Sequence, residues 1–278
     1  MLAALGLCLA FWIAGAGCSP GGGAGLLDVH SGARLSLAQA AGELAGSRLV
    51  VVGEDHSRPA HRRFQAALIR ALAGTGAGVA VGLEMFPASA QALLDGYGAG
   101  TVDEAAVEKA FAAYWGQGWE SYREVLRACR ELGLPLVGLN VPREVVRKVA
   151  REGFAALSPG ERGALPMVAC RVDREYEAFL RRVAGDHGVG LDFRKFCEAQ
   201  LVWDTAMAVA ARDALAAHPG RLLVVLCGAS HAWKPAVPHQ LRQLAPQLSL
   251  RVVLPEAPGR LEPATAGPGD CDYLALGL

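Results

Sequence analysis

Two apolar runs that each end in the pattern G-x-x-H constrain the fold of this chain more than any other feature of its sequence. The first reads VVVGEDH at 50–56, and the second reads VVLCGASH at 224–231. A β-branched run is typical of a strand buried on both faces, and a glycine lets the backbone turn where the strand ends. Because ligands of open α/β sheets bind outside the carboxyl ends of the strands, we expect His56 and His231 to lie at one site.

Two more apolar runs end in polar residues. The run at 79–84 ends in Glu84, and the run at 134–140 ends in Asn140. Imidazole and carboxylate groups ligate zinc and similar metals, and they also serve as general acids and bases. The candidate set for either role is Glu54, His56, Glu84 and His231. The alternative for each of them is a solvated loop residue or a helix N-cap.

Strand-like and helical patterns alternate along the chain, which is typical of an α/β fold. Helical spacing follows the first two strands at 59–73 and 87–97, and no strand is expected around 102–132 or 158–218. We therefore expect one α/β domain at 31–278, with a large, mainly parallel sheet flanked by helices. The two strandless stretches predict helical insertions, and the longer one predicts a helical subdomain beside the sheet.

The amino terminus has the features of a bacterial lipoprotein signal. An apolar stretch at 2–13 precedes small residues and then Cys18. We expect a signal peptide at 1–17, a lipidated Cys18 and a flexible tether at 18–30, which would hold the protein at the cell envelope. An ordinary cleaved signal and an uncleaved anchor are the alternatives.

The charge balance and the cysteine spacing make several classes of partner and of cysteine motif unexpected in this chain. The chain has 27 Lys and Arg against 27 Asp and Glu, so no nucleic-acid partner is expected. Apart from Cys8 and Cys18, five of its 7 cysteines remain, and none of them forms a C-x-x-C motif. A zinc ribbon, a thioredoxin-type motif and c-type haem attachment are therefore not predicted.

Five motifs, taken in order, resemble those of ChaN-like haem-binding uptake proteins, which share a superfamily with the Tiki and TraB proteins and the erythromycin esterases. The motifs are GEDH at 53–56 with His61, LEMF at 83–86, GLNVPR at 138–143, AQLVWD at 199–204 and GASH at 228–231. The resemblance covers nearly the whole chain after the leader. It implies an α/β fold with a helical subdomain and a tethered lipoprotein of bacterial iron uptake, on the periplasmic or outer-membrane side.

The resemblance also implies haem as the ligand, with a tyrosine on the iron and with two stacked haems enclosed by a homodimer. A phenolate is a suitable ligand for Fe(III) haem. Tyr97 and Tyr114 are the first choices because they flank the strandless insertion, and the other tyrosines are Tyr122, Tyr176 and Tyr273. Arg143 is a candidate for a haem propionate, and His61 is a candidate for a supporting role. The dense aromatic group at 111–122 would wall a planar ligand or form the core of a helix pair.

The related esterases imply a second interpretation, a metal-dependent hydrolase. His56 and His231 would then hold a divalent metal ion or act as acid and base. Glu54 or Glu84 would activate water, and Arg143 would stabilise negative charge. A third interpretation is a binding or assembly protein that has lost both activities. Gln200 and Asp204 lie on one helix face, so they would be site residues only if that face meets the crevice.

Overall fold

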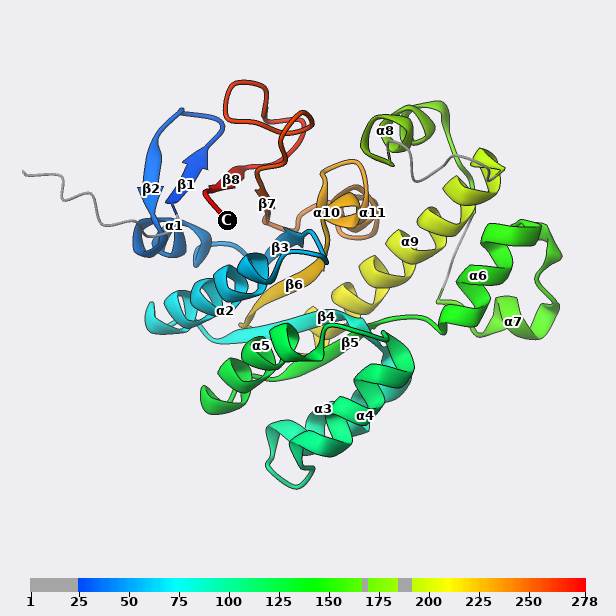
Figure 1. The fold of residues 1–278 in the computed structure, drawn as a ribbon, viewed down its shortest axis with the longest axis horizontal. Coiled ribbons are helices and arrows are strands. Elements are labelled where there is room, and N and C mark those ends of the chain that lie inside the picture. The colour runs from blue at the N-terminus through cyan, green and yellow to red at the C-terminus, as the bar shows by residue number, and fades with distance from the viewer. Residues whose placement is uncertain (1–24, 167–169, 185–191) are drawn as a thin grey trace, which may run out of the picture.

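A computed structural model describes residues 25–166, 170–184 and 192–278 of the chain. Eight strands form one sheet in the order β2-β1-β8-β7-β3-β6-β4-β5 (Figure 1). The strands are β1 Gly25–Asp28, β2 Arg34–Ser36, β3 Leu49–Glu54, β4 Val79–Pro87, β5 Leu136–Asn140, β6 Leu222–Gly228, β7 Leu250–Pro255 and β8 Tyr273–Leu276. The expected α/β fold with a large, mainly parallel sheet is confirmed, since β5, β4, β6, β3, β7 and β8 pair in parallel.

Helices cover both faces of the sheet. They are α1 Leu37–Leu44, α2 Pro59–Gly74, α3 Gln91–Gly98, α4 Glu104–Tyr114, α5 Trp119–Glu131, α6 Arg143–Glu152, α7 Pro159–Gly163, α8 Arg174–Ala184, α9 Phe193–Ala217, α10 Ala229–Ala232 and α11 Val237–Leu244. Two short 3-10 helices, η1 Ala88–Ala90 and η2 Phe154–Ala156, complete the set. Helices α4 and α5 occupy the strandless stretch at 102–132, and α7, α8 and α9 lie in the stretch at 158–218.

The alternation of side chains along β3 divides the protein into two cores. Val50 and Val52 face a core that contains residues of α1 to α5, whereas Leu49 and Val51 face a core formed with α8, α9 and α11. Successive side chains of a strand point to opposite faces, so a strand buried between two helical layers must be apolar throughout. A third, smaller core joins α6, together with Leu157 and Leu165 on either side of α7, to α9, beside the sheet.

The amino-terminal part of the domain differs from the expectation. Residues 25–28 of the tether expected at 18–30 instead form β1, which pairs antiparallel with β2 and with β8. These strands have only four and three residues, too few for a clear period-2 pattern. The expected signal peptide and Cys18 lie outside the described residues.

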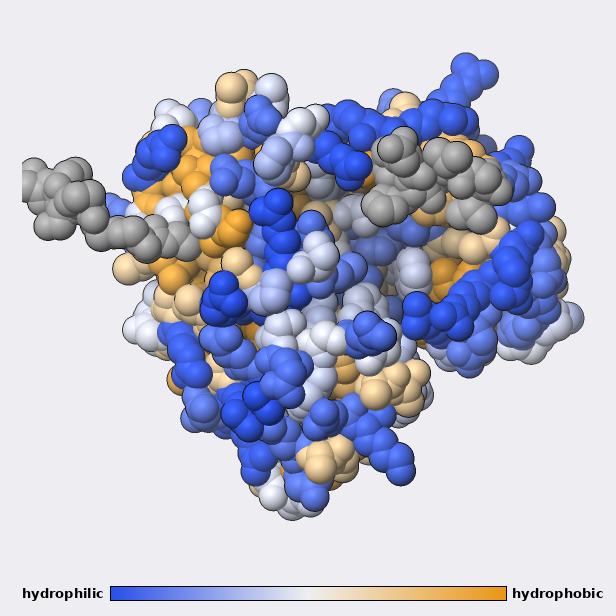
Figure 2. All heavy atoms as spheres, viewed as in Figure 1, coloured by the Kyte–Doolittle hydropathy of each residue, from blue (hydrophilic) through white to orange (hydrophobic). Residues whose placement is uncertain are grey.

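The surface of the face seen in Figure 2 is mostly hydrophilic over the helices, with apolar atoms gathered over β1 and β2. Within the residues that the structure describes, no helix is both long enough and apolar enough to span a bilayer.

Candidate functional site

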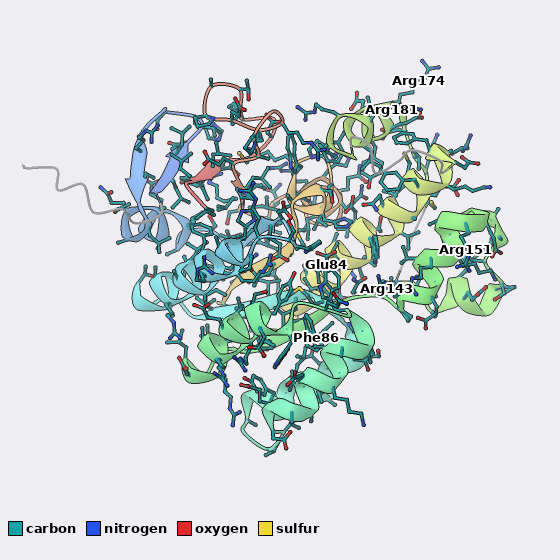
Figure 3. The ribbon with its side chains drawn as sticks, in the orientation of Figure 1. Glu84, Phe86, Arg143, Arg151, Arg174 and Arg181 are labelled. Carbon is teal, nitrogen blue, oxygen red and sulfur yellow. The ribbon has the colours of Figure 1, made fainter. Side chains whose placement is uncertain are left out.

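The carboxyl ends of three neighbouring strands bring the candidate residues together. Strand β6 lies between β3 and β4, so the turns after β3 and β6 are adjacent. Glu54 ends β3, Glu84 lies near the end of β4, and His231 lies in α10 directly after β6. These three residues are buried, whereas the side chain of His56 is 45% exposed. Figure 3 shows Glu84 at this edge, close to Arg143 at the start of α6.

His56 belongs to a triad with a buried carboxylate and a buried phenol. Its Nδ1 lies 2.7 Å from Oε1 of Glu54, and Tyr122 of α5 donates its hydroxyl hydrogen to the same oxygen. The Tyr122 oxygen also lies 3.1 Å from the His56 Nδ1. We call this group the Glu54 triad.

His231 belongs to a second triad of the same composition. Its Nδ1 lies 2.6 Å from Oδ1 of Asp204 in α9, and the Tyr176 hydroxyl of α8 donates to Oδ2 of that carboxylate at 2.5 Å. All three side chains are buried. We call this group the Asp204 triad. Each triad therefore ties Nδ1 of one histidine to a buried carboxylate.

Glu84 lies between the two histidines. Its Oε2 accepts a hydrogen bond from the Gly228 backbone N–H at 2.6 Å, and its Oε1 is 3.7 Å from the His231 Nε2. Gly228 also leaves room for His56, because a Cβ at this position would lie 2.8 Å from the His56 Nε2. The glycine that ends β6 thus allows the two histidine turns to come into contact.

Two side chains from the start of α2 fix the backbone of the turn after β3. His61 accepts the Asp55 backbone N–H on its Nδ1 at 2.8 Å. Arg62, which is buried, donates to the backbone oxygens of Asp55 at 2.7 Å and His56 at 2.8 Å. Its guanidinium also lies 3.7 Å from Oε2 of Glu54. His61 therefore shapes the turn that presents His56, and it lies outside the pocket lining.

A pocket of about 480 Å³ opens above these residues, within the usual size range of small-molecule sites. The indole rings of Trp115 and Trp203 and the phenol of Tyr114 line it together with Met85 and Val141. Its polar lining consists of His56, Glu84, Ser89, Asn140, Arg143, Glu144, Gln200, Ser230 and His231. The rings of Trp115 and Trp203 stand edge-on to His56 and His231 with centroid separations of 5.0 and 5.5 Å.

The surrounding charges favour the protonated form of both histidines. Burial alone would lower the pKa of His231, but the carboxylates of Asp204 and Glu84 outweigh it and raise the pKa to about 8. The pKa of His56 is also raised, because the hydrogen bond to Glu54 and the charge of Glu84 exceed the effect of burial. Burial and the adjacent carboxylate raise the pKa of Tyr122 and of Tyr176, so both phenols stay neutral.

The structure separates the two tyrosines expected near the ligand. Tyr114 lies in the pocket lining and is 39% exposed. Tyr97 is fully buried in the core below α3, with the Arg130 guanidinium 4.9 Å from its ring centroid. Tyr97 is therefore out of reach of a ligand in this pocket. Arg143 lies at the rim and donates to the Trp115 backbone oxygen at 3.3 Å.

The expected metal ligands do not form one metal-binding group. Nδ1 of His56 and Nδ1 of His231 are directed at two different carboxylates, and Glu84 binds a backbone N–H. Among the described residues, no group of three or more His, Cys, Asp or Glu side chains is arranged to hold a metal ion. The donor set fits two separate hydrogen-bonded triads.

Sequence reasoning missed the roles of Tyr122, Tyr176 and Arg62 beside the histidines and their carboxylates. Tyr122 and Tyr176 were counted only as alternative iron ligands, and Arg62 was not considered. Gln200 lines the pocket, while Asp204, one helical turn later, lies behind His231. No local pattern marks Tyr122, Tyr176 or Asp204, because each comes from a helix distant in sequence from the histidine that it serves, whereas Arg62 lies only six residues after His56.

Comparison with known proteins identifies the family. A family model described as haem-binding uptake, Tiki superfamily, ChaN matches residues 40–241. The chain belongs to this family. A solved structure of ChaN from Campylobacter jejuni with cofacial haem superposes on this ChaN-family chain with a TM-score of 0.70 and 18% identity, covering 91% of this chain and 97% of that one.

Two further similarities are weaker. The structure of an erythromycin esterase mutant in its open conformation gives a TM-score of 0.47 and 15% identity, covering 84% of this ChaN-family chain and 76% of that chain. The chloroplastic protein RETICULATA-RELATED 5 of Arabidopsis thaliana is 34% identical over 85 residues. That match spans 30% of this chain and only 11% of the length of the relative.

Proposed function

We propose that this protein binds haem in the pocket between Tyr114 and Trp203 and serves bacterial haem or iron uptake. The observation that carries the proposal is the exposure of Tyr114. All five tyrosines of the chain lie in its described part, and Tyr114 alone is exposed, at 39%, whereas the other four are 0 to 6% exposed. Membership of a haem-binding family supports the same ligand.

The lining of the pocket fits haem. Aromatic side chains bind a flat apolar ring well, and here Trp115, Trp203 and Tyr114 share one pocket. Tyr114 would hold the haem by offering its phenolate to the iron, since a phenolate is a suitable ligand for Fe(III). Arg143, exposed at the rim, would take a propionate through its planar guanidinium.

We extend the proposal to the location and assembly of the protein. A lipid on Cys18 would tether the domain to the cell envelope, on its periplasmic or outer-membrane side. A homodimer would close two copies of the pocket over stacked haems. The lipobox-like sequence before Cys18 and the family membership support these two statements.

A hemin titration followed at the Soret band tests the proposal. We expect saturable binding by the wild-type protein, and we expect Tyr114→Phe to change the spectrum and weaken binding because the iron loses its phenolate. Tyr97→Phe is the matched control, since Tyr97 is fully buried away from the pocket, and it should bind like the wild type. Absence of a saturable shift, or equal effects of both substitutions, would rule out this assignment.

A second candidate function is acid–base hydrolysis at the floor of the same pocket. The observation in its favour is that both histidines carry a carboxylate on Nδ1, an arrangement that suits proton transfer at Nε2. His56 and His231 would exchange protons with water and the leaving group, and Arg143 would stabilise negative charge. Ester hydrolysis that is lost in His231→Gln, in protein that binds no hemin, would favour this alternative.

A further inference from the structure

The two pocket histidines are held by the same three kinds of side chain, although the segments that supply them are unrelated in sequence. In each triad a buried tyrosine donates its hydroxyl to a buried carboxylate, and the carboxylate lies against Nδ1 of a histidine. The supplying elements are α5 and β3 for His56, and α8 and α9 for His231. Because the arrangement occurs twice on unrelated elements, it indicates that both histidines of the site need this support, and that it is not an accident of how one helix packs.

A buried carboxylate needs hydrogen-bond partners, because a charged group removed from water without them is strongly destabilising. Asp204 is 1% exposed, and Tyr176 and His231 together engage both of its oxygens. Glu54 is 2% exposed and has Tyr122, His56 and, at 3.7 Å, Arg62. In both triads the phenol supplies a neutral hydrogen-bond donor that the carboxylate would otherwise lack.

We propose that Tyr122 and Tyr176 are positioning residues. Each orients its carboxylate so that the histidine carries its proton on Nδ1 and keeps Nε2 directed toward the ligand of the pocket. The tyrosines themselves do not touch the ligand. The statement that a ligand reaches Nε2 depends on the proposed function, whereas the control of the histidines by the tyrosines does not.

The two triads differ in one contact, which predicts different sensitivities. The Tyr122 oxygen lies 3.1 Å from Nδ1 of His56 and shares Oε1 of Glu54 with it, whereas Tyr176 uses the oxygen of Asp204 that His231 does not. Loss of the Tyr122 hydroxyl therefore frees His56 to rotate as well. Loss of the Tyr176 hydroxyl changes mainly the charge on Asp204.

The groups that face each histidine are few. His231 faces Asp204 of α9, Glu84 of β4, His56 and the ring of Trp203. His56 faces Glu54 and Tyr122 together with Glu84, His231 and the ring of Trp115.

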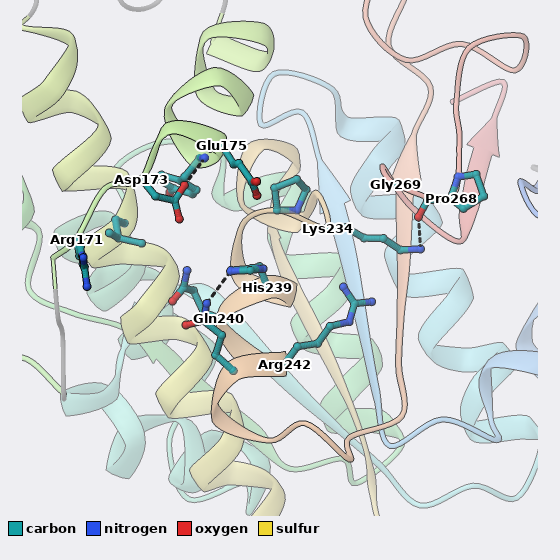
Figure 4. A pocket seen from close by; sticks show the side chains of 13 residues that line it. Arg171, Asp173, Glu175, Lys234, His239, Gln240, Arg242, Pro268 and Gly269 are labelled. Carbon is teal, nitrogen blue, oxygen red and sulfur yellow. Dashed lines mark hydrogen bonds between the residues drawn. The ribbon is translucent and has the colours of Figure 1, made fainter.

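The ring of Tyr176 also lines a separate pocket of about 820 Å³, where Arg171, His239 and Arg242 lie and Lys234 donates to the Pro268 backbone oxygen (Figure 4). A change from Tyr176 to Phe keeps that ring in place, so it removes only the hydroxyl.

Nitrogen-15 NMR of the histidine side chains, recorded across a pH titration without haem or substrate, tests the proposal. In the wild type we expect both neutral histidines to carry the proton on Nδ1. In Tyr176→Phe the carboxylate of Asp204 loses its neutral donor and acts more strongly on the imidazole, so the pKa of His231 should rise while that of His56 stays unchanged. In Tyr122→Phe the change should fall on His56, with mixed tautomers.

Two further variants complete the design. Asp204→Asn removes the charge while keeping an oxygen acceptor, so it should lower the pKa of His231, opposite to Tyr176→Phe. Tyr273→Phe is the matched control, because that phenol donates to Glu43 at 2.7 Å, outside both triads, and its loss should move neither histidine. Circular dichroism and thermal melting verify that each variant is folded.

Unchanged tautomers and titrations in folded Tyr122→Phe and Tyr176→Phe would overturn the proposal, as would an equal change in Tyr273→Phe. If one tyrosine variant does not fold, the other tyrosine variant still tests the proposal at its own histidine, against Tyr273→Phe as the control. Because the NMR uses no ligand, the expected shifts together with a failed hemin titration would reject the proposed haem function alone.

Discussion

At the scale of single residues, Gly228 decides how close the two halves of the site can come. Its backbone N–H binds Glu84, and the ring of His56 lies against its Cα. Gly228 has φ −54 and ψ 144, which any residue can adopt, so the requirement for glycine is one of space. A Cβ here would lie 2.8 Å from Nε2 and 3.1 Å from Cε1 of His56.

Gly228→Ala should therefore displace His56 from Glu54. Because His56 is half-exposed and can swing outward, we expect stability to fall by only about 1 kcal/mol or less. The pKa of His56 should fall toward its ordinary value as the bond to Glu54 weakens, while His231 should titrate as in the wild type. Histidine NMR and urea unfolding measure both effects. A large loss of stability with an unchanged His56 titration would contradict this account.

At the scale of elements, the end of β4 departs from regular pairing with β5. The register shifts between Leu83 and Pro87, and this irregularity lies where β4 delivers Glu84. Gly138 of β5 permits it, because a Cβ there would lie 2.4 Å from the backbone oxygen of Pro87 and 2.9 Å from its carbonyl carbon. A glycine within a strand often marks such a close backbone approach.

Gly138→Ala should be strongly destabilising, because the obstructing atoms belong to the backbone and have no rotamer to change. We expect a loss of about 2 to 4 kcal/mol in the free energy of unfolding. Gly74→Ala is the control, since nothing lies within 4 Å of its added Cβ at the end of α2, and it should change stability by about 0.5 kcal/mol or less. Urea denaturation of the two variants compares them directly, and equal stabilities would refute the steric argument.

At the scale of the whole molecule, the protonation of the buried His231 makes the free energy of unfolding depend on pH. The folded protein holds the pKa of His231 at about 8, above its ordinary 6.5, so folding favours the imidazolium. The contribution is fully present below about pH 6.5 and is lost as the pH rises through about 8.

The stability of the wild type should therefore exceed that of His231→Gln by more at pH 6 than at pH 9. Across this range the difference should shrink by up to about 2 kcal/mol, the free energy that corresponds to the shift in pKa. Urea unfolding of both proteins at the two pH values measures it, with His218→Gln as a control because His218 lies away from the two triads. A difference that stays constant or grows with pH would show that folding does not favour the charged form.

The sequence by itself determined the elements that depend on local pattern. The valine runs at 50–52 and 224–225 had to become strands buried on both faces, and the glycines after them had to turn the chain toward a common edge. Those two facts placed His56 and His231 at one site. Membership of the family and the mainly parallel sheet follow from the same order of motifs.

Only the tertiary structure decided which side chains serve the histidines and which tyrosine is accessible. Tyr97 lies in α3 just before the helical insertion and Tyr114 ends α4 within it, yet helix packing buries the first completely and leaves the second 39% exposed. Asp204 and Tyr176 reach His231 from α9 and α8, far away in sequence. Local pattern governs backbone conformation over a few residues, whereas burial and hydrogen bonding between distant segments arise only when the helices pack on the sheet.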